Sequence, residues 1–246
     1  MSVSPLRGKT ALVTGASGAI GRALALALAE RGASLFLTGR DPARLQECRD
    51  AARAAGAEPG VEVDGLAADL APDGAVEALA ARLEERFGGA DLLVHALGAY
   101  AAGPVAETPV EELDRQLAVN LRVPYRLTRR LLPGLVERRG QVVFVSSSAA
   151  VRPRGGVAAY AASKAALWAL ADALRDELNP AGVRVLSVFP GRTASAMQEE
   201  VHRLEGKAYR PERLLQPVDV AATIVAALEL PDTAELTDLH IRPMKK

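Results

Sequence analysis

Short apolar segments alternate along the chain with longer segments rich in Ala, Leu, Arg and Glu. Apolar runs bounded by turn residues are typical of buried strands, and apolar residues three and four positions apart are typical of helices. The alternation predicts seven strands, at 10–14, 34–38, 61–67, 91–95, 141–146, 183–188 and 236–241. It predicts six helices, near 19–31, 41–56, 73–87, 109–138, 158–179 and 217–229, with a weaker helical pattern over 196–204.

Strands that alternate with helices of this length form βαβ units, whose crossovers place helices on both faces of a parallel sheet. The unbroken apolar run Val142–Val145 fits a strand buried on both faces. We therefore expect one α/β domain over 1–246, of the doubly wound Rossmann type, with a seven-stranded, mostly parallel sheet. The segment 191–216 breaks the pattern, and we expect it to form a loop over the substrate.

Charge and composition exclude several classes of protein. Thirty basic and thirty acidic residues give a net charge of zero, whereas binding to nucleic acid or anionic membranes usually requires a basic excess. Cys48 is the only cysteine, so we expect no intrachain disulfide and no metal site. The first residues lack a signal-peptide pattern, and the apolar stretch 23–29 is too short to span a membrane. These features predict a soluble cytoplasmic protein.

A glycine-rich turn follows the first strand and opens the first helix. Glycines at such a turn allow a sharp bend and close approach to a pyrophosphate, while the helix N-terminus offers free N–H groups. A tight strand-to-helix turn is the alternative interpretation. Its place in the first βα unit favours a dinucleotide site. The residues expected to bind the dinucleotide are Gly15, Ser17, Gly18, Ile20 and Gly21.

The spacing of this turn, Thr-Gly-x-x-x-Gly-x-Gly, resembles that of the short-chain dehydrogenases/reductases. Against that pattern, Gly39 stands where an acidic residue would bind the ribose of NAD, and Arg40 follows it. Glycine leaves room for a 2′-phosphate, which Arg40 can bind bidentately. Asp41 is expected to cap the helix that begins at Pro42. The sequence thus predicts NADPH in preference to NADH.

The resemblance implies further contacts with the dinucleotide. It places Asp69 at the adenine, although Asp69 also suits a cap before Pro72, and it places Gly98 at the adenine ribose. The turn at Pro190 and Gly191 would lie beside the nicotinamide. Thr193 and Ser195 would then offer hydroxyls to the carboxamide or phosphate.

Tyr160 and Lys164 are four residues apart in a predicted helix and therefore share one face. A free phenol titrates near pH ~10, and a neighbouring ammonium can lower that pKa. The alternative is an amphipathic helix in which the two side chains only happen to be close. The resemblance implies that Ser147 polarises the substrate carbonyl, that Asn120 helps hold a water linking Lys164 to solvent, and that Lys164 also binds the nicotinamide ribose.

Together these residues predict an NADPH-dependent carbonyl reductase that can also run as an alcohol dehydrogenase, with Tyr160 as general acid/base. One departure from the family is His95-Ala-Leu-Gly98 in place of Asn-Asn-Ala-Gly. We expect His95 to be buried and to replace the asparagine in tying the central strands together. That segment is similar to the enoyl-thioester reductases of the same superfamily, although those enzymes space tyrosine and lysine further apart. A catalytically silent NADPH-binding regulator is a third possibility.

The substrate is less defined than the chemistry. A group of basic residues could attract an anionic substrate or a carrier arm. Alternatively, they could form a solvated surface together with the glutamates in the same segment. The basic residues are Arg152, Arg154, Arg192, Arg203, Lys207, Arg210 and Arg213. The resemblance also implies a homodimer or homotetramer in which helices near 109–138 and 158–179 pair across a two-fold axis.

Overall fold

The computed structural model describes residues 3–56 and 59–244. The strands are β1 (Thr10–Thr14), β2 (Ser34–Gly39), β3 (Val63–Ala67), β4 (Leu92–His95), β5 (Gln141–Val145), β6 (Arg184–Pro190) and β7 (Asp238–Ile241). The helices are α1 (Ala19–Glu30), α2 (Pro42–Ala55), α3 (Ala75–Phe87), α4 (Val110–Leu117), α5 (Val123–Glu137), α6 (Ser148–Val151), α7 (Ala158–Leu178), α8 (Ala196–Leu204) and α9 (Pro217–Leu228). A π-helical turn, Ala118–Arg122, joins α4 to α5, and two 3₁₀ turns lie at Asn179–Ala181 and Pro211–Arg213.

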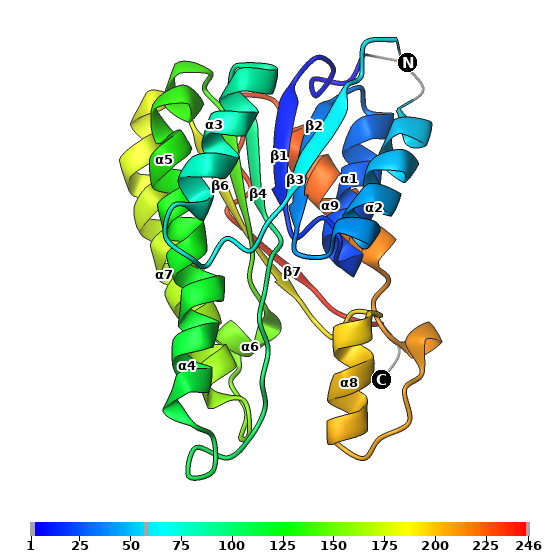
Figure 1. The fold of residues 1–246 in the computed structure, drawn as a ribbon, viewed down its shortest axis with the longest axis vertical. Coiled ribbons are helices and arrows are strands. Elements are labelled where there is room, and N and C mark those ends of the chain that lie inside the picture. The colour runs from blue at the N-terminus through cyan, green and yellow to red at the C-terminus, as the bar shows by residue number, and fades with distance from the viewer. Residues whose placement is uncertain (1–2, 57–58, 245–246) are drawn as a thin grey trace.

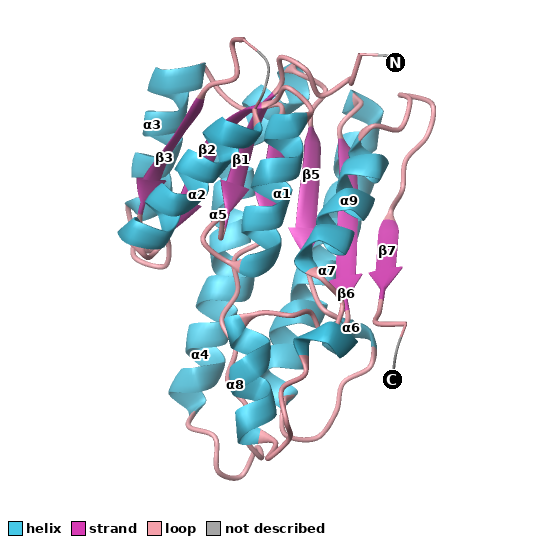
Figure 2. Cartoon of the chain, turned by 90° about the vertical axis from the view of Figure 1, so that its right-hand side faces the viewer, coloured by secondary structure: helices cyan, strands magenta, loops and turns pink. Residues whose placement is uncertain are grey.

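The seven strands form one sheet in the order β3-β2-β1-β4-β5-β6-β7, and every pairing is parallel. The predicted α/β class and strand count are confirmed, and the expected "mostly parallel" sheet is parallel throughout. Figure 2 shows the strand arrows pointing the same way, so their carboxyl ends meet at a single edge of the sheet.

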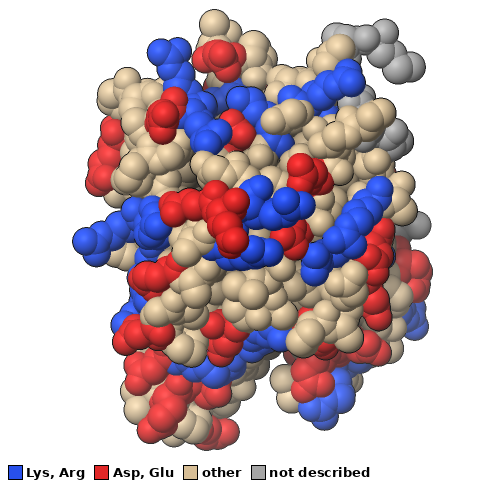
Figure 3. All heavy atoms as spheres, turned by 45° about the horizontal axis from the view of Figure 1, so that its top comes forward, with Lys and Arg blue, Asp and Glu red and all other residues tan. Residues whose placement is uncertain are grey.

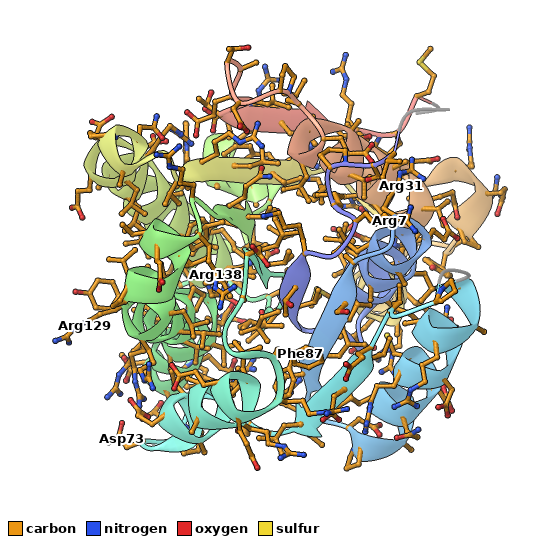
Figure 4. All side chains as sticks on the ribbon, turned by 90° about the horizontal axis from the view of Figure 1, so that it is seen from above. Arg7, Arg31, Asp73, Phe87, Arg129 and Arg138 are labelled. Atoms are coloured by element: carbon orange, nitrogen blue, oxygen red, sulfur yellow. The ribbon has the colours of Figure 1, made fainter. Side chains whose placement is uncertain are left out.

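Helices cover both faces of the sheet (Figure 1). On one face α1, α2 and α9 contribute Leu24, Leu45 and Ile224 to a core with alternate strand residues such as Val13. On the other face α3, α5 and α7 contribute a second core, including Leu83, Leu127 and Leu167, with the intervening strand residues such as Leu12. Successive strand side chains therefore enter opposite cores, and both must be apolar. This is why the strands are unbroken apolar runs. Seen from above, the two helical layers enclose the strands (Figure 4).

The order of the strands reverses between β1 and β4, because the chain leaves β1 toward β2 and returns to pair β4 on the other side of β1. In open α/β sheets, ligands bind outside the carboxyl ends of the strands at this switch point. The glycine-rich turn after β1 and the segment 96–98 after β4 both lie there. The sheet therefore positions the two segments that the sequence assigns to a dinucleotide.

Two helical regions differ from the sequence prediction. The helix expected over 109–138 is divided by the π-helical turn Ala118–Arg122, which adds one residue to a turn and does not disturb the apolar spacing of α5. The short helix α6 was not predicted, because four residues are too few to show a period. The weaker pattern over 196–204 does form a helix, α8, which Ser195 caps through the Gln198 N–H.

Charges of both signs are interspersed on the face of Figure 3, with no large region of one sign in that view. Within residues 3–56 and 59–244, no helix is long and apolar enough to cross a membrane. Over the same residues, no group of three or more His, Cys, Asp or Glu side chains is arranged to hold a metal ion.

Candidate active site

A cavity of about 400 Å³ opens at the carboxyl edge of the strands, around the switch point. It is lined by most of the residues that the sequence assigned to a dinucleotide: Gly15, Ser17, Gly18, Ile20, Gly21, Arg40, Asp69, Gly98, Tyr160, Lys164 and Thr193. The cavity runs from the start of α2 to the middle of the sheet and on to the first residues of α8.

The turn after β1 brings its backbone close to the chain that follows β4. Gly15 has φ +69°, and a Cβ there would lie 2.6 Å from the Leu97 nitrogen, so only glycine fits. Gly18 precedes α1, and no side chain caps the first N–H groups of that helix. Uncapped N–H groups at a helix N-terminus suit a phosphate. The turn therefore fits the pyrophosphate of a dinucleotide.

Two arginines, Arg40 directly after β2 and Arg44 in the first turn of α2, line one end of the cavity. Neither the Arg40 nor the Arg44 side chain forms an ion pair with any described residue. Asp41 lies between them, but its carboxylate caps α2 by accepting from the Ala43 and Arg44 N–H groups, as predicted. Gly39 also leaves space for the Ser17 side chain, because a Cβ at position 39 would lie 2.5 Å from the Ser17 hydroxyl oxygen.

Tyr160 and Lys164 project from the same face of α7 into the cavity. Lys164 is 3% exposed, and its ammonium donates to the Val145 carbonyl at 3.0 Å, while its backbone carbonyl accepts from the Ser146 hydroxyl. Ser147 caps α6 by accepting from the Ala149 N–H at 3.1 Å. Three of the four catalytic residues proposed from the sequence, Ser147, Tyr160 and Lys164, therefore lie after the end of β5 and at the start of α7.

The acid–base properties differ from the expectation in one respect. Burial raises the pKa of Tyr160, and a hydrogen bond from Ser147 opposes that rise only partly. Burial lowers the pKa of Lys164 to about 8. The expected lowering of the Tyr160 pKa by Lys164 is not found, because the phenol is withdrawn from water and the ammonium bonds the Val145 carbonyl. Tyr160 is therefore held in its neutral form.

Asn120 lies in the π-helical turn, fully buried beside the cavity. Its Oδ1 accepts from the Ala99 N–H at 2.7 Å, and its Nδ2 donates to the Ala99 carbonyl and to the Ser163 hydroxyl, both at 2.9 Å. A Cβ on Gly98 would lie 3.6 Å from Asn120 Oδ1 and 3.7 Å from Lys164 Nζ. The structure thus brings Asn120, Gly98 and Lys164 together.

His95 is 1% exposed at the end of β4, as expected, but its side-chain hydrogen bond does not join the central strands. Its Nε2 bonds the Thr128 hydroxyl of α5 at 2.9 Å, and its ring stacks on Phe144. Burial, together with the nearby charge of Lys164, lowers the pKa of His95 to about 3. The histidine therefore links the strand to a helix in its neutral form, because α5 offers a hydroxyl at the distance an imidazole reaches.

The two ends of the segment 191–216 pair with each other, and ion pairs join residues within the segment. Thr193 forms a parallel bridge with Leu215, and Glu205 pairs with both Arg192 and Lys207. Pro190 and Gly191 are not part of the cavity wall; Gly191 packs instead beneath Arg242 and Pro243. The pairing of three of the basic residues, including Arg203 with Glu200, favours the solvated-surface interpretation for them.

Sequence reasoning did not single out Tyr100 or Arg44. Tyr100 lies in the loop after β4, and its ring meets the Tyr160 ring edge to face, with centroids 5.0 Å apart. No periodic pattern marks a residue in such a loop. The role of Arg44 could have been predicted from the sequence. Asp41 and Pro42 mark the start of a helix, and Arg44 lies in its first turn, four residues after Arg40.

The sequence and the fold are similar to those of known short-chain dehydrogenases. The family model for the short chain dehydrogenases matches residues 9–206. An uncharacterized short-chain type dehydrogenase/reductase of Sinorhizobium fredii, y4eK, is 34% identical over 242 residues, which are 96% of this chain and 92% of that protein. Xylitol dehydrogenase with bound NAD+ has a TM-score of 0.87 at 26% identity, covering 97% of this chain and 99% of the other. A variant of actinorhodin polyketide ketoreductase with NADPH has a TM-score of 0.87 at 29% identity, covering 97% of each chain.

Fold and site together define an NAD(P)-dependent oxidoreductase built on a Rossmann-type sheet. The chain belongs to the short-chain dehydrogenase/reductase family. Its structural neighbours include both NAD+ and NADPH complexes, so the family alone does not decide between the two cofactors.

Proposed function

We propose that the protein is an NADPH-dependent carbonyl reductase, able to run in reverse as an alcohol dehydrogenase, with Tyr160 as its general acid/base. The observation that carries the proposal is the position of Tyr160 on the wall of the cavity that the glycine turn and Lys164 also line. A carbonyl group placed there would meet the proton donor at the end of the sheet where dinucleotides bind.

The state of Tyr160 suits reduction. Its raised pKa keeps the phenol protonated, which is the form that can donate a proton to a carbonyl oxygen as negative charge develops on it. Ser147 Oγ accepts from the Ala149 N–H and has one proton of its own, which would turn from Tyr160 to the same oxygen when a carbonyl binds. The two hydroxyls would act on one substrate oxygen.

Lys164 supplies a buried positive charge beside this pair and has donor capacity beyond its bond to Val145. The charge favours the step in which Tyr160 gives up its proton. Both amide hydrogens of Asn120 are engaged by the protein, so we assign Asn120 to holding this edge of the site in place. The bound nicotinamide would supply the hydride.

The residues around the cavity fit NADPH. The glycine turn and the uncapped N-terminus of α1 would hold the pyrophosphate, Asp69 and Gly98 the adenosine, and Thr193, Tyr160 and Lys164 the nicotinamide end. Arg40 and Arg44 have no acidic partner among the described residues and line the same end of the cavity, beside Gly39. Two unpaired guanidinium groups favour a 2′-phosphate over a ribose hydroxyl.

The chain also exposes a surface suited to self-association. The outer face of α7 carries Ala162, Ala169 and Ala173, all exposed, and small residues allow close approach of a second helix. We propose a homodimer or homotetramer through α5 and α7, which light scattering of the purified protein tests. A monomer would contradict it.

The function is tested by NADPH consumption over a panel of ketones, aldehydes, a 3-oxoacyl thioester and an enoyl thioester. Carbonyl reduction requires turnover with at least one of the first three. Turnover with the enoyl thioester alone would favour the enoyl reductase alternative. Tight NADPH binding with no turnover on any member would favour the silent regulator.

A further inference from the structure

One aromatic side chain in the site is assigned no role by the chemistry above. Tyr100 is half-buried, and its ring stands at 70° to the ring of Tyr160, with centroids 5.0 Å apart. The two tyrosines come from different elements, Tyr160 from α7 and Tyr100 from the loop between β4 and α4. In Figure 1 this loop runs down beside α4, across from α8.

The loop backbone around Tyr100 is fixed on three consecutive residues. Ala99 is bonded at both its N–H and its carbonyl by Asn120, the Tyr100 carbonyl accepts from Arg115 at 3.2 Å, and the Ala101 N–H donates to Gln116 at 3.3 Å. Gln116, like Asn120, is fully buried. A loop side chain held by so many contacts from the helical layer has a defined position beside Tyr160.

Charged residues at the base of the α8 segment influence Tyr100. The charges of Glu205 and Arg192 both act on its phenol, and burial raises its pKa, so the hydroxyl stays neutral. Those two residues are already paired with each other at 2.5 Å. The ring contact with Tyr160 places Tyr100 beside the proposed proton donor, next to the cavity that Tyr160 lines.

The cavity that Tyr160 lines has an apolar part at the start of α8. Ala196 and Met197, the first residues of α8, line the adjoining part of the cavity, and Met197 is 44% exposed. Methionine adapts its shape to apolar groups and contacts aromatic rings favourably. Two perpendicular phenol rings form a corner into which a flat group fits edge to face with one and stacked on the other.

We propose that Tyr100 determines substrate specificity at this site, and that its ring selects carbonyl compounds whose carbonyl bears a planar aromatic group. This rests on the proposed carbonyl reduction. Aromatic stacking in a partly buried site contributes enough to change a preference by about three- to tenfold.

The test compares acetophenone with cyclohexyl methyl ketone, which have nearly the same size but differ in planarity. The ratio of kcat/KM for the two ketones is measured in the wild type and in Tyr100→Leu, so that their intrinsic reactivities cancel. We expect the ratio to fall by at least about threefold in Tyr100→Leu and to be retained in Tyr100→Phe. Val105→Ala is the control, since Val105 lies on the same loop and is 76% exposed. An unchanged ratio in Tyr100→Leu overturns the proposal.

A second measurement separates this inference from the proposed function. Benzamide and cyclohexanecarboxamide are unreactive analogues of the two ketones, and their dissociation constants are measured with NADPH present. We expect tighter binding of benzamide to the wild type and loss of that preference in Tyr100→Leu. If no carbonyl compound of the panel is reduced but the binding contrast holds, the function fails and the specificity assignment stands. Equal binding of the two amides by the wild type overturns the assignment.

Discussion

Asn120 holds Ala99 by both of its backbone groups, accepting from the N–H at 2.7 Å and donating to the carbonyl at 2.9 Å. The pair joins the π-helical turn to the loop after β4, and it fixes Gly98 on one side and Tyr100 on the other. Because both partners are buried, removing the amide leaves donors and acceptors without partners, which costs more than the bonds themselves contribute.

We therefore expect Asn120→Ala to lower the free energy of unfolding by about 2–4 kcal/mol and to reduce turnover as well. Asn179→Ala is the matched control, because among the described residues the Asn179 side-chain amide bonds only Glu235, at the surface, and its loss should cost less than about 1 kcal/mol. Urea denaturation measures both. Equal losses of unfolding free energy in the two variants would contradict a larger contribution of the Asn120–Ala99 hydrogen bonds to stability.

Arg40 and Arg44 are expected to set the preference for NADPH. A charge-assisted hydrogen bond to phosphate contributes about 1.5–3 kcal/mol, so either arginine replaced by alanine should weaken NADPH binding by about ten- to a hundredfold. NADH binding should change by less than about threefold, because NADH lacks the phosphate. Arg129→Ala is the control, since Arg129 points outward from α5 (Figure 4). Equal weakening of NADH and NADPH would contradict the assignment.

The charge of Lys164 gives the reaction a pH dependence. With its pKa lowered to about 8, the side chain is an ammonium below that pH and an amine above it. If the ammonium assists proton transfer from Tyr160, kcat for reduction should fall by about tenfold per pH unit above about pH 8. In Lys164→Arg the side chain stays charged, so the remaining kcat should not fall above about pH 8. A wild-type profile that stays flat to about pH 9.5 would contradict this role.

His95 should make the protein less stable in mild acid. Its pKa is lowered from 6.5 to about 3 in the folded protein, so between these values the unfolded chain binds a proton that the folded chain does not. Stability from this residue is complete above pH ~6.5 and decreases as the pH falls toward ~3. The loss between about pH 7 and about pH 5 amounts to about 2 kcal/mol. Urea denaturation at both pH values should show this difference in the wild type but not in His95→Asn. The same pH dependence in both proteins would contradict it.

The sequence predicted the fold because each signal was local. Apolar runs such as Val142–Val145 and the helix carrying Tyr160 and Lys164 need no knowledge of their partners to be assigned. The order of the strands along the sheet then follows from the family and from the position of the glycine turn. Boundaries differ by only a few residues, as for β3, which begins at Val63.

Features that depend on contacts across the fold could not be predicted. The helices on either side of the π-helical turn at Asn120 each keep the helical spacing of apolar residues. The sequence pattern therefore does not show the turn between them. The partner of His95 is Thr128, 33 residues away, and no spacing rule relates them. The raised pKa of Tyr160 reflects how deeply the assembled site withdraws the phenol from water, whereas the spacing to Lys164 reports only that a cation is near.

The proton-donor role of Tyr160 is tested most directly by Tyr160→Phe, with turnover of a reducible carbonyl and the NADPH dissociation constant measured on the same preparation. The substitution removes the phenolic proton and leaves the ring, so we expect kcat to fall by at least about a thousandfold while NADPH binding changes by less than about threefold. Turnover retained within about tenfold of the wild type, with NADPH binding intact, would contradict the assignment of Tyr160 as the acid.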